Sequence, residues 1–199
     1  MAPVLVNPDK VREFADAGSF YAWLGQHHAT DDEIWIKIHK RGSGLASITA
    51  KEAIDVVLCW GWIDAIRKGF DDRSFLQRYT PRGKKSIWSQ INVGNVARLI
   101  REGRMTRYGL IHVESAKADG RWARAYGSGK AMKIPVDLQA AIDAEPKARQ
   151  MLEKLSAQNR FALAFRMHHL KTEAGRRKRI EVFVAMLMRG ETIYPQGGN

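Results

Sequence analysis

Cysteine is almost absent from this chain, because Cys59 is the only one among the 199 residues. A lone cysteine cannot close an internal disulfide, so no disulfide framework is expected and a reducing compartment is favoured. Long apolar runs are absent too: the longest near the C-terminus, residues 183–188, is far too short to cross a bilayer. The start of the chain lacks a basic segment followed by an apolar one, so no secretory signal is expected. These absences predict a cytoplasmic protein with no membrane span.

Patterns typical of catalytic and metal sites are also missing. The histidines form no i, i+4 pair and no His-Glu-x-x-His motif, and no Gly-x-Ser-x-Gly elbow is present. Cys59 lies in an apolar run, which predicts a small core residue with an unactivated thiol. We therefore expect no catalytic residue, no metal and no cofactor, and a non-enzymatic role is favoured. The six histidines are His27, His28, His39, His112, His168 and His169.

Acidic residues are scarce in one window of the sequence. The chain has a net charge of +12, and residues 73–107 contain nine Lys or Arg but a single Asp or Glu. Residues 1–72 are slightly acidic, with 8 Lys or Arg against 11 Asp or Glu. A concentrated positive field attracts polyanions and repels cationic partners. The alternative is that these charges are spread over a solvated face and serve solubility.

Local patterns predict an α+β fold. Residues 33–40 alternate between Ile and polar or aromatic side chains, which indicates a half-buried strand. Residues 62–68 and 74–80 are typical of two strands joined as a hairpin. Helices are expected to start at four residues that can cap a helix N-terminus: Ser19, Thr49, Ser86 and Thr106.

The C-terminal third is expected to be helical after a Gly/Ser/Lys loop at residues 127–130. Its clearest pattern is the apolar i, i+3, i+4, i+7, i+8 stripe that begins at Ile180. We predict an α+β body, residues 1–127, with a small antiparallel sheet packed with helices. A helical, bundle-like part, residues 128–199, would follow it.

The centre of the basic window, YTPRGKKSIWSQIN at residues 79–92, resembles half of a phosphate loop. It is not a P-loop, because Gly83 is one residue too far from Ser86 and Arg78 stands where the first glycine would fall. A looser anion site remains, in which Arg82, Lys84, Lys85 and Ser86 surround the predicted helix start. The alternative is that Ser86 only caps the helix and the lysines are solvated.

Tryptophans flank the same region. Strand alternation puts Trp62 and Asp64 on one face, so that Asp64 could pair with Arg78, or Trp62 could stack under a guanidinium. An aromatic floor with basic rims suits a nucleotide or single-stranded nucleic acid, whereas core packing is the alternative for each tryptophan. The basic, aromatic segment at residues 120–126 is compatible with a loop anchor or a ligand contact. The predicted ligand-binding set is Trp62, Asp64, Arg78, Arg82, Lys84, Lys85, Ser86 and Trp88.

Several longer strings resemble the family named YdeI/OmpD-associated, also called bacteriocin-protection proteins, over about residues 10–195. They are WLGQHH, EIWIKIHK, EAIDVVLCWGWIDA, RYTPRGKKSIWSQIN, GRMTRYGL, AKADGRW and AGRRKRIEVFVAMLMRG. The resemblance implies a role in bacterial tolerance of bacteriocins and cationic antimicrobial peptides, and it implies no reaction.

Charge narrows how such a role could arise. A protein of net charge +12 repels cationic peptides within about 8 Å at physiological salt, so direct sequestration is disfavoured. We expect a non-enzymatic stress-tolerance protein that binds an anionic ligand. The alternatives are a nucleic-acid-binding module and an enzyme that acts on a phosphorylated small molecule.

Overall fold

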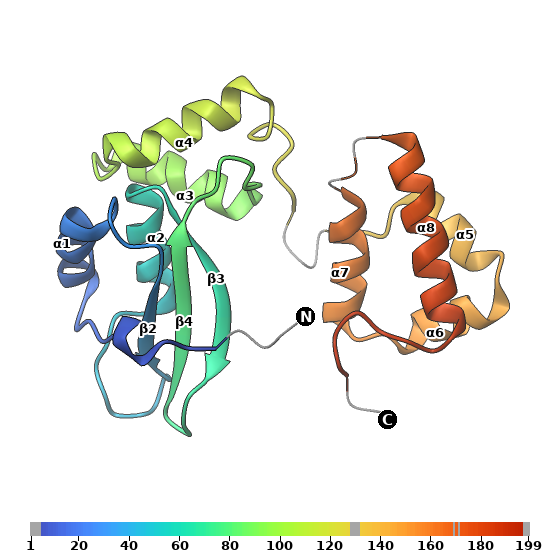
Figure 1. Cartoon of the computed structure of the whole chain (residues 1–199), viewed down its shortest axis with the longest axis horizontal. Helices are drawn as coiled ribbons and strands as arrows, with labels where there is room; N and C mark the ends of the chain where they lie inside the picture. Colours follow the sequence, from blue (N-terminus) through green and yellow to red (C-terminus); the bar gives the residue numbers. More distant parts are fainter. Residues whose placement is uncertain (1–4, 128–131, 169, 171, 197–199) are drawn as a thin grey trace. The chain divides into compact units, whose positions relative to one another are not determined.

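The chain folds into two compact units, residues 1–125 and 126–199. The computed structural model describes residues 5–127, 132–168, 170 and 172–196, so most of the predicted loop at 127–130 lies outside the described residues. The first unit is an α+β body and the second is helical, which confirms the predicted fold class (Figure 1).

The first unit is built on a four-stranded sheet with the order β1-β2-β4-β3. Antiparallel pairing joins β2 to β4 and β4 to β3, so the predicted strand and hairpin are confirmed. The two-residue β1 pairs with β2 in parallel, which makes the sheet mixed rather than purely antiparallel. The strands are β1 (Val11–Arg12), β2 (Ile34–His39), β3 (Trp62–Gly69) and β4 (Ser74–Pro81).

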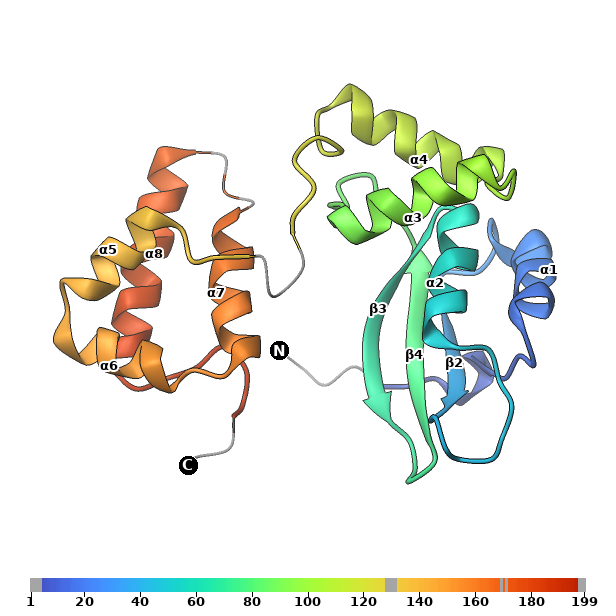
Figure 2. The same cartoon turned by 180° about the vertical axis from the view of Figure 1, so that it is seen from behind.

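One face of this sheet packs against α1 (Ala17–His27) and α2 (Ala50–Cys59). Figure 1 shows α2 behind the strands, and Figure 2 shows it in front. Burial of this apolar surface is the main source of the unit's stability. The core includes Phe20 and Leu24 of α1, Ile34, Ile36 and Ile38 of β2, and Val56 and Val57 of α2.

Strand β2 is more buried than its alternation predicted. Trp35 belongs to the face opposite the isoleucines, yet it is 0% exposed. Its cross-strand partner on that face is Arg78, whose Nε lies 2.5 Å from Glu33 Oε2. On the same face, Lys37 donates a hydrogen bond to Glu13 over 2.9 Å. Long charged side chains with apolar stems can cover such a face while their charges stay near water.

The first two helices begin with different caps. The prediction that Ser19 caps the first helix is wrong: Asp16 is the cap, and its carboxylate accepts the backbone N–H of Ser19. The predicted capping box of the second helix is confirmed, because Thr49 and Glu52 each accept the other's backbone N–H.

A second core of this unit forms where α3 (Gln90–Arg101) and α4 (Arg107–Ala118) meet the C-terminal half of α2. In Figure 1 the two helices lie at the end of the sheet where β4 finishes. Thr106 caps α4 as predicted and also donates its hydroxyl to the carbonyl of Cys59 over 2.6 Å. This bond ties the start of α4 to the end of α2. The core members are Leu58, Cys59, Trp88, Val96, Leu99, Val113 and Ala116.

In the part of the second unit that the structure describes, four helices surround one apolar core. The stripe predicted from Ile180 onward is confirmed as far as Leu187, because Phe183 and Leu187 are buried in that core. Its last predicted member, Met188, is exposed. Arg176 begins a run of four basic residues, 176–179, and is ion-paired with Asp137 of α5. The helices are α5 (Val136–Asp143), α6 (Pro146–Lys154), α7 (Ala157–His168) and α8 (Glu173–Met188).

One polar side chain fastens the C-terminal segment to this unit. Asn159 of α7 is 1% exposed, and its amide nitrogen donates to the carbonyl of Tyr194 and to Oε1 of Gln196. Its side-chain oxygen accepts the backbone N–H of Tyr194 over 2.9 Å. A buried amide is tolerated only when it is hydrogen-bonded in this way. Within the described residues, no helix is long and apolar enough to traverse a bilayer.

Candidate functional site

The loop between β4 and α3 is built around a buried arginine. Arg82 is 4% exposed, and its guanidinium lies over the ring of Trp88 at 3.7 Å from the ring centroid. Nη1 donates to the carbonyl of Ile87 over 3.1 Å, and the backbone N–H donates to the carbonyl of Gly61 over 2.9 Å. A desolvated cation over an indole face is a favourable contact. Arg82 therefore fixes both ends of its own loop.

Because of this arrangement, the next helix starts later in the chain than predicted. The prediction that Ser86 caps the helix is wrong, because α3 begins at Gln90 and Ser89 accepts the backbone N–H of Asn92. Residues 84 and 85 form a turn instead, and residues 86–88 have no regular secondary structure. The lysines thus precede the helix by a full loop rather than surrounding its N-terminus.

A second segment, directly after α4, packs onto this loop. The rings of Trp122 and Trp88 meet edge to face, with centroids 4.9 Å apart. Arg121 donates from Nη1 to the carbonyl of Ser86 over 2.8 Å, and its Nε lies 2.7 Å from Asp119. Two basic segments about 35 residues apart are therefore held together by an aromatic contact and a hydrogen bond.

The charges of Arg82 and Arg121 both affect His112 of α4. The pKa of His112 is lowered, first by burial and then by the positive charges of Arg82 and Arg121. The ring also lies close to the chain: a Cβ at Gly61 would lie 2.6 Å from its Cδ2. Gly61 has a φ of +74°, so both its conformation and this close approach favour glycine.

We name Arg82, Lys84, Lys85, His112 and Arg121 the basic loop cluster. Lys84 and Lys85 are exposed, whereas the other members are buried or half-buried. Asp119 pairs with Arg121, while the positive charges of Arg82 and Arg121 add to burial in lowering the pKa of His112. Chemically, this arrangement can attract an anion to two exposed ammonium groups backed by two fixed guanidinium groups.

The remaining predicted site residues lie elsewhere in the sheet. Trp62 is 1% exposed on the helix-covered face, and its Nε1 donates to the carbonyl of His28. Asp64 is exposed next to a bulge in β3, and Arg78 pairs with Glu33 rather than with Asp64. The predicted Asp64–Arg78 pair is therefore wrong, and the arginine that stacks on a tryptophan is Arg82.

The structure adds residues that the sequence did not single out. Arg121 and Trp122 belong to the segment 120–126, which sequence reasoning left open between an anchor and a ligand contact. The contacts with Ser86 and Trp88 show that it anchors the loop, and Arg121 also belongs to the basic loop cluster. His112 carries no motif around it, so no signal in the sequence could have placed it here.

Two other kinds of site, a reactive thiol and a metal site, find no support in the described residues. Burial raises the pKa of the Cys59 thiol to about 11, so it is protonated at neutral pH. Among the described residues, which exclude His169, no three His, Cys, Asp or Glu side chains are grouped to hold a metal ion.

Fold and cluster together define a two-unit protein, an α+β domain with a basic loop cluster followed by a helical domain. The chain belongs to the family defined by the domain of unknown function DUF8412, whose model matches residues 12–112. Residues 131–190 match the model described as bacteriocin-protection, YdeI or OmpD-associated, which confirms the resemblance over that segment. No curated protein and no solved structure matches the chain.

Proposed function

We propose that this protein supports bacterial tolerance of bacteriocins and cationic antimicrobial peptides by binding an anionic ligand at the basic loop cluster. It acts in the cytoplasm and catalyses no reaction. The match of residues 131–190 to the bacteriocin-protection model supports the tolerance role. The observation that carries the binding site is that two arginines from separate segments, Arg82 and Arg121, are hydrogen-bonded to the loop that bears the exposed Lys84 and Lys85.

The ligand is recognised by charge rather than by aromatic stacking. Trp62 and Trp88 were the candidates for an aromatic floor, and they are 1% and 2% exposed. A base cannot stack on a buried indole, so these residues offer no platform of the kind used for single strands. Ammonium and guanidinium groups instead favour phosphate, sulfate or carboxylate groups.

An anionic partner also fits the whole protein better than a cationic one. With a net charge of +12, the protein repels the peptides themselves. Tolerance then arises indirectly, through the anionic ligand and not through capture of the peptide.

A titration of His112 tests the site. Its pKa is measured by NMR from the ring proton signals, which a His112→Gln variant assigns, in sodium chloride and in sodium sulfate of equal ionic strength. Sulfate bound at the cluster stabilises the protonated ring, so we expect a higher pKa of His112 in sulfate. Equal pKa values of His112 in the two salts would show that the cluster does not bind sulfate, and the proposed site would be wrong.

Paired variants separate the cluster from general charge. Lys84→Ala with Lys85→Ala should abolish the sulfate effect. Lys147→Ala with Lys154→Ala removes two exposed lysines from α6 and should preserve it. Both pairs reduce the net charge by the same amount, so a difference between them reports the site and not the overall field.

The biological role has a separate test. A strain that lacks this protein is complemented with the wild type or with either lysine pair, and survival in polymyxin B is counted. We expect the Lys84/Lys85 pair to lose protection and the Lys147/Lys154 pair to retain it. If both pairs protect equally, while sulfate binding is lost only in the first, the anion site has no part in tolerance.

A further inference from the structure

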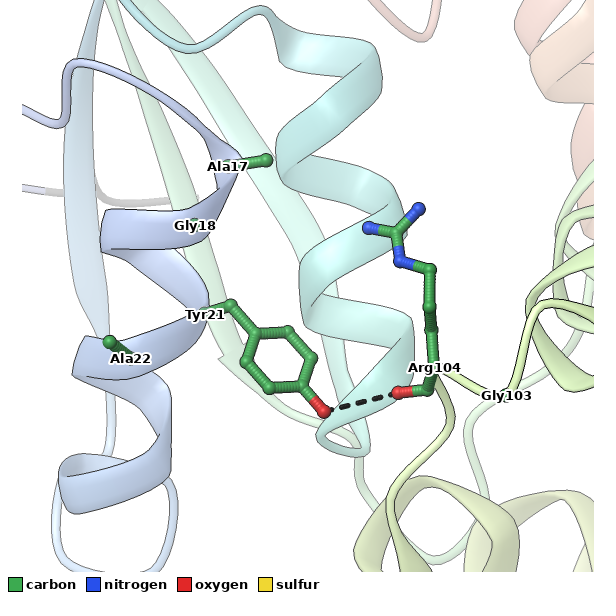
Figure 3. Close-up of a pocket in the computed structure, with 6 residues that line it drawn as sticks. All are labelled: Ala17, Gly18, Tyr21, Ala22, Gly103 and Arg104. Carbon is green, nitrogen blue, oxygen red and sulfur yellow. Dashed lines mark hydrogen bonds between the residues drawn. The ribbon is translucent and has the colours of Figure 1, made fainter.

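The first unit has a surface hollow that does not belong to the basic loop cluster. It has a volume of about 440 Å³ and lies between the first turns of α1 and the connection from α3 to α4 (Figure 3). Its size falls within the usual range for small-molecule sites. The lining residues are Ala17, Gly18, Tyr21 and Ala22 of α1, and Gly103 and Arg104 of the connection.

The walls of the hollow are fixed by hydrogen bonds and packing. Tyr21 donates its hydroxyl to the carbonyl of Arg104 over 3.1 Å, which joins the two sides (Figure 3). The ring of Tyr21 also packs on Trp60, with centroids 5.2 Å apart. On the other side, the backbone N–H of Arg104 donates to the carbonyl of Leu99 over 3.0 Å. The hollow is therefore preformed.

Small residues line the hollow, and contacts with neighbouring atoms do not explain why residue 18 is a glycine. Gly18 has no positive φ, and a Cβ at this position would meet only Asp16 Oδ1, at an ordinary 3.4 Å. Neither backbone conformation nor crowding requires glycine here, although glycine in a helix is less stable than alanine by up to about 1 kcal/mol. A larger side chain at this position would occupy the space.

The lining defines the chemistry of a ligand. An aromatic ring and two alanine methyl groups suit a flat apolar body. Arg104 places a guanidinium at the rim, where its partner Glu102 lies 3.3 Å away in a partly exposed ion pair. Exposed ion pairs contribute little, so an incoming anion can take over Arg104. Asp16, beside Gly18, disfavours the anionic group at the opposite wall.

We propose that this hollow binds a small aromatic anion, a carboxylate or a sulfonate, with its ring against Tyr21 and Ala22 and its charged group on Arg104. The proposal does not rest on the anion site at the basic loop cluster. Removal of Lys84 and Lys85 should leave binding in the hollow unchanged.

Naphthalene-1-sulfonate is a suitable probe, and naphthalene-1-methanol is its uncharged control. Titration into the ¹⁵N-labelled full chain is followed by the amide signals of Gly18 and Gly103, which lie on the two walls. We expect both signals to shift with one saturating curve for the sulfonate, and at least tenfold weaker binding of the alcohol. Saturation that leaves both signals in place would overturn the proposal.

Two variants test the walls, each with a matched control. Ala22→Phe fills the hollow from an exposed helix position, and Ala185→Phe makes the same change at an exposed position of α8. Arg104→Gln removes the rim cation, and Arg101→Gln removes an exposed arginine of α3. We expect affinity to fall at least tenfold in Ala22→Phe and about fivefold in Arg104→Gln, with both controls within twofold of wild type. Wild-type affinity in a folded Ala22→Phe protein would show that the probe binds elsewhere.

Discussion

At the scale of single residues, Gly109 lies where α4 approaches α2 closely. It lies in α4, and a Cβ there would sit 2.4 Å from the carbonyl oxygen of Cys59 and 2.7 Å from that of Leu58. Backbone atoms cannot move aside as a flexible side chain can. The contact between α4 and α2 therefore requires a residue without a side chain.

Two glycine substitutions test this requirement against helix propensity. Gly109→Ala should lower the free energy of unfolding by about 1–3 kcal/mol through overpacking. Gly94→Ala, at an exposed position of α3 with nothing within 4 Å of the added methyl, should raise it by about 0.5–1 kcal/mol. Urea unfolding measures both changes, and a neutral Gly109→Ala would show that α4 does not pack on α2 as described.

His112 should make stability depend on pH. Its pKa in the folded chain lies below the ordinary value of 6.5, because of burial and then of Arg82 and Arg121. Below pH 6.5 the unfolded chain therefore binds a proton that the folded chain does not, and the free energy of unfolding falls as the pH falls toward the lowered pKa. We expect the loss between pH 7.5 and 5.5, measured by urea unfolding, to be smaller in His112→Gln. An equal loss in both proteins would contradict the lowered pKa.

At the scale of elements, the helix starts show where local patterns fail. Two residues that can cap a helix lie three positions apart before α3, Ser86 and Ser89. The same is true at the start of α1, with Asp16 and Ser19. Local preference alone does not distinguish the two members of each pair. The structure uses Ser89 because Arg82 and Trp88 hold the chain before it in a loop. That choice depends on tertiary contacts, which propensity does not contain.

Alanine substitutions distinguish the two serines. Ser89→Ala should lower the free energy of unfolding by about 1 kcal/mol, since it removes the acceptor for the N–H of Asn92. Ser86→Ala should change it by less than about 0.5 kcal/mol, as expected for a loop position without a cap. Thermal or urea unfolding of the two variants provides the measurement. A larger loss from Ser86→Ala would place the helix start where the sequence suggested.

The elements with strong periodicity were predictable, and the site was predictable only in part. Alternation located β2 and the β3–β4 hairpin, whereas the two-residue β1 is too short to show a period. Charge density located Arg82, Lys84 and Lys85 in one window of the sequence. Their partner Arg121 could not be found, because its contact with Ser86 spans 35 residues and depends on how α4 packs.

At the scale of the whole molecule, each unit has its own apolar core. Among the described residues, no member of the cores in residues 1–125 also belongs to the core in residues 126–199. The two family models likewise match separate stretches, 12–112 and 131–190. Both facts are expected of domains that fold as units.

Separate expression tests this independence. We expect the fragments 1–125 and 126–199 each to unfold cooperatively on heating. Far-ultraviolet circular dichroism, which reports helix content, follows the transition. Gly109→Ala should lower the melting temperature of the first fragment, as we also expect in the full chain. A second fragment without a cooperative transition would mean that its core is completed by residues outside 126–199.

The hydrogen bonds of Asn159 also constrain when the helical unit can fold during synthesis. Its amide partner in Gln196 lies 37 residues further along the chain. At the usual pace of translation, that stretch takes about 2–7 s to make, and for that time the asparagine lacks the partners that allow it to be buried. The helical unit can therefore bury Asn159 with these partners only after residues 194–196 have been made.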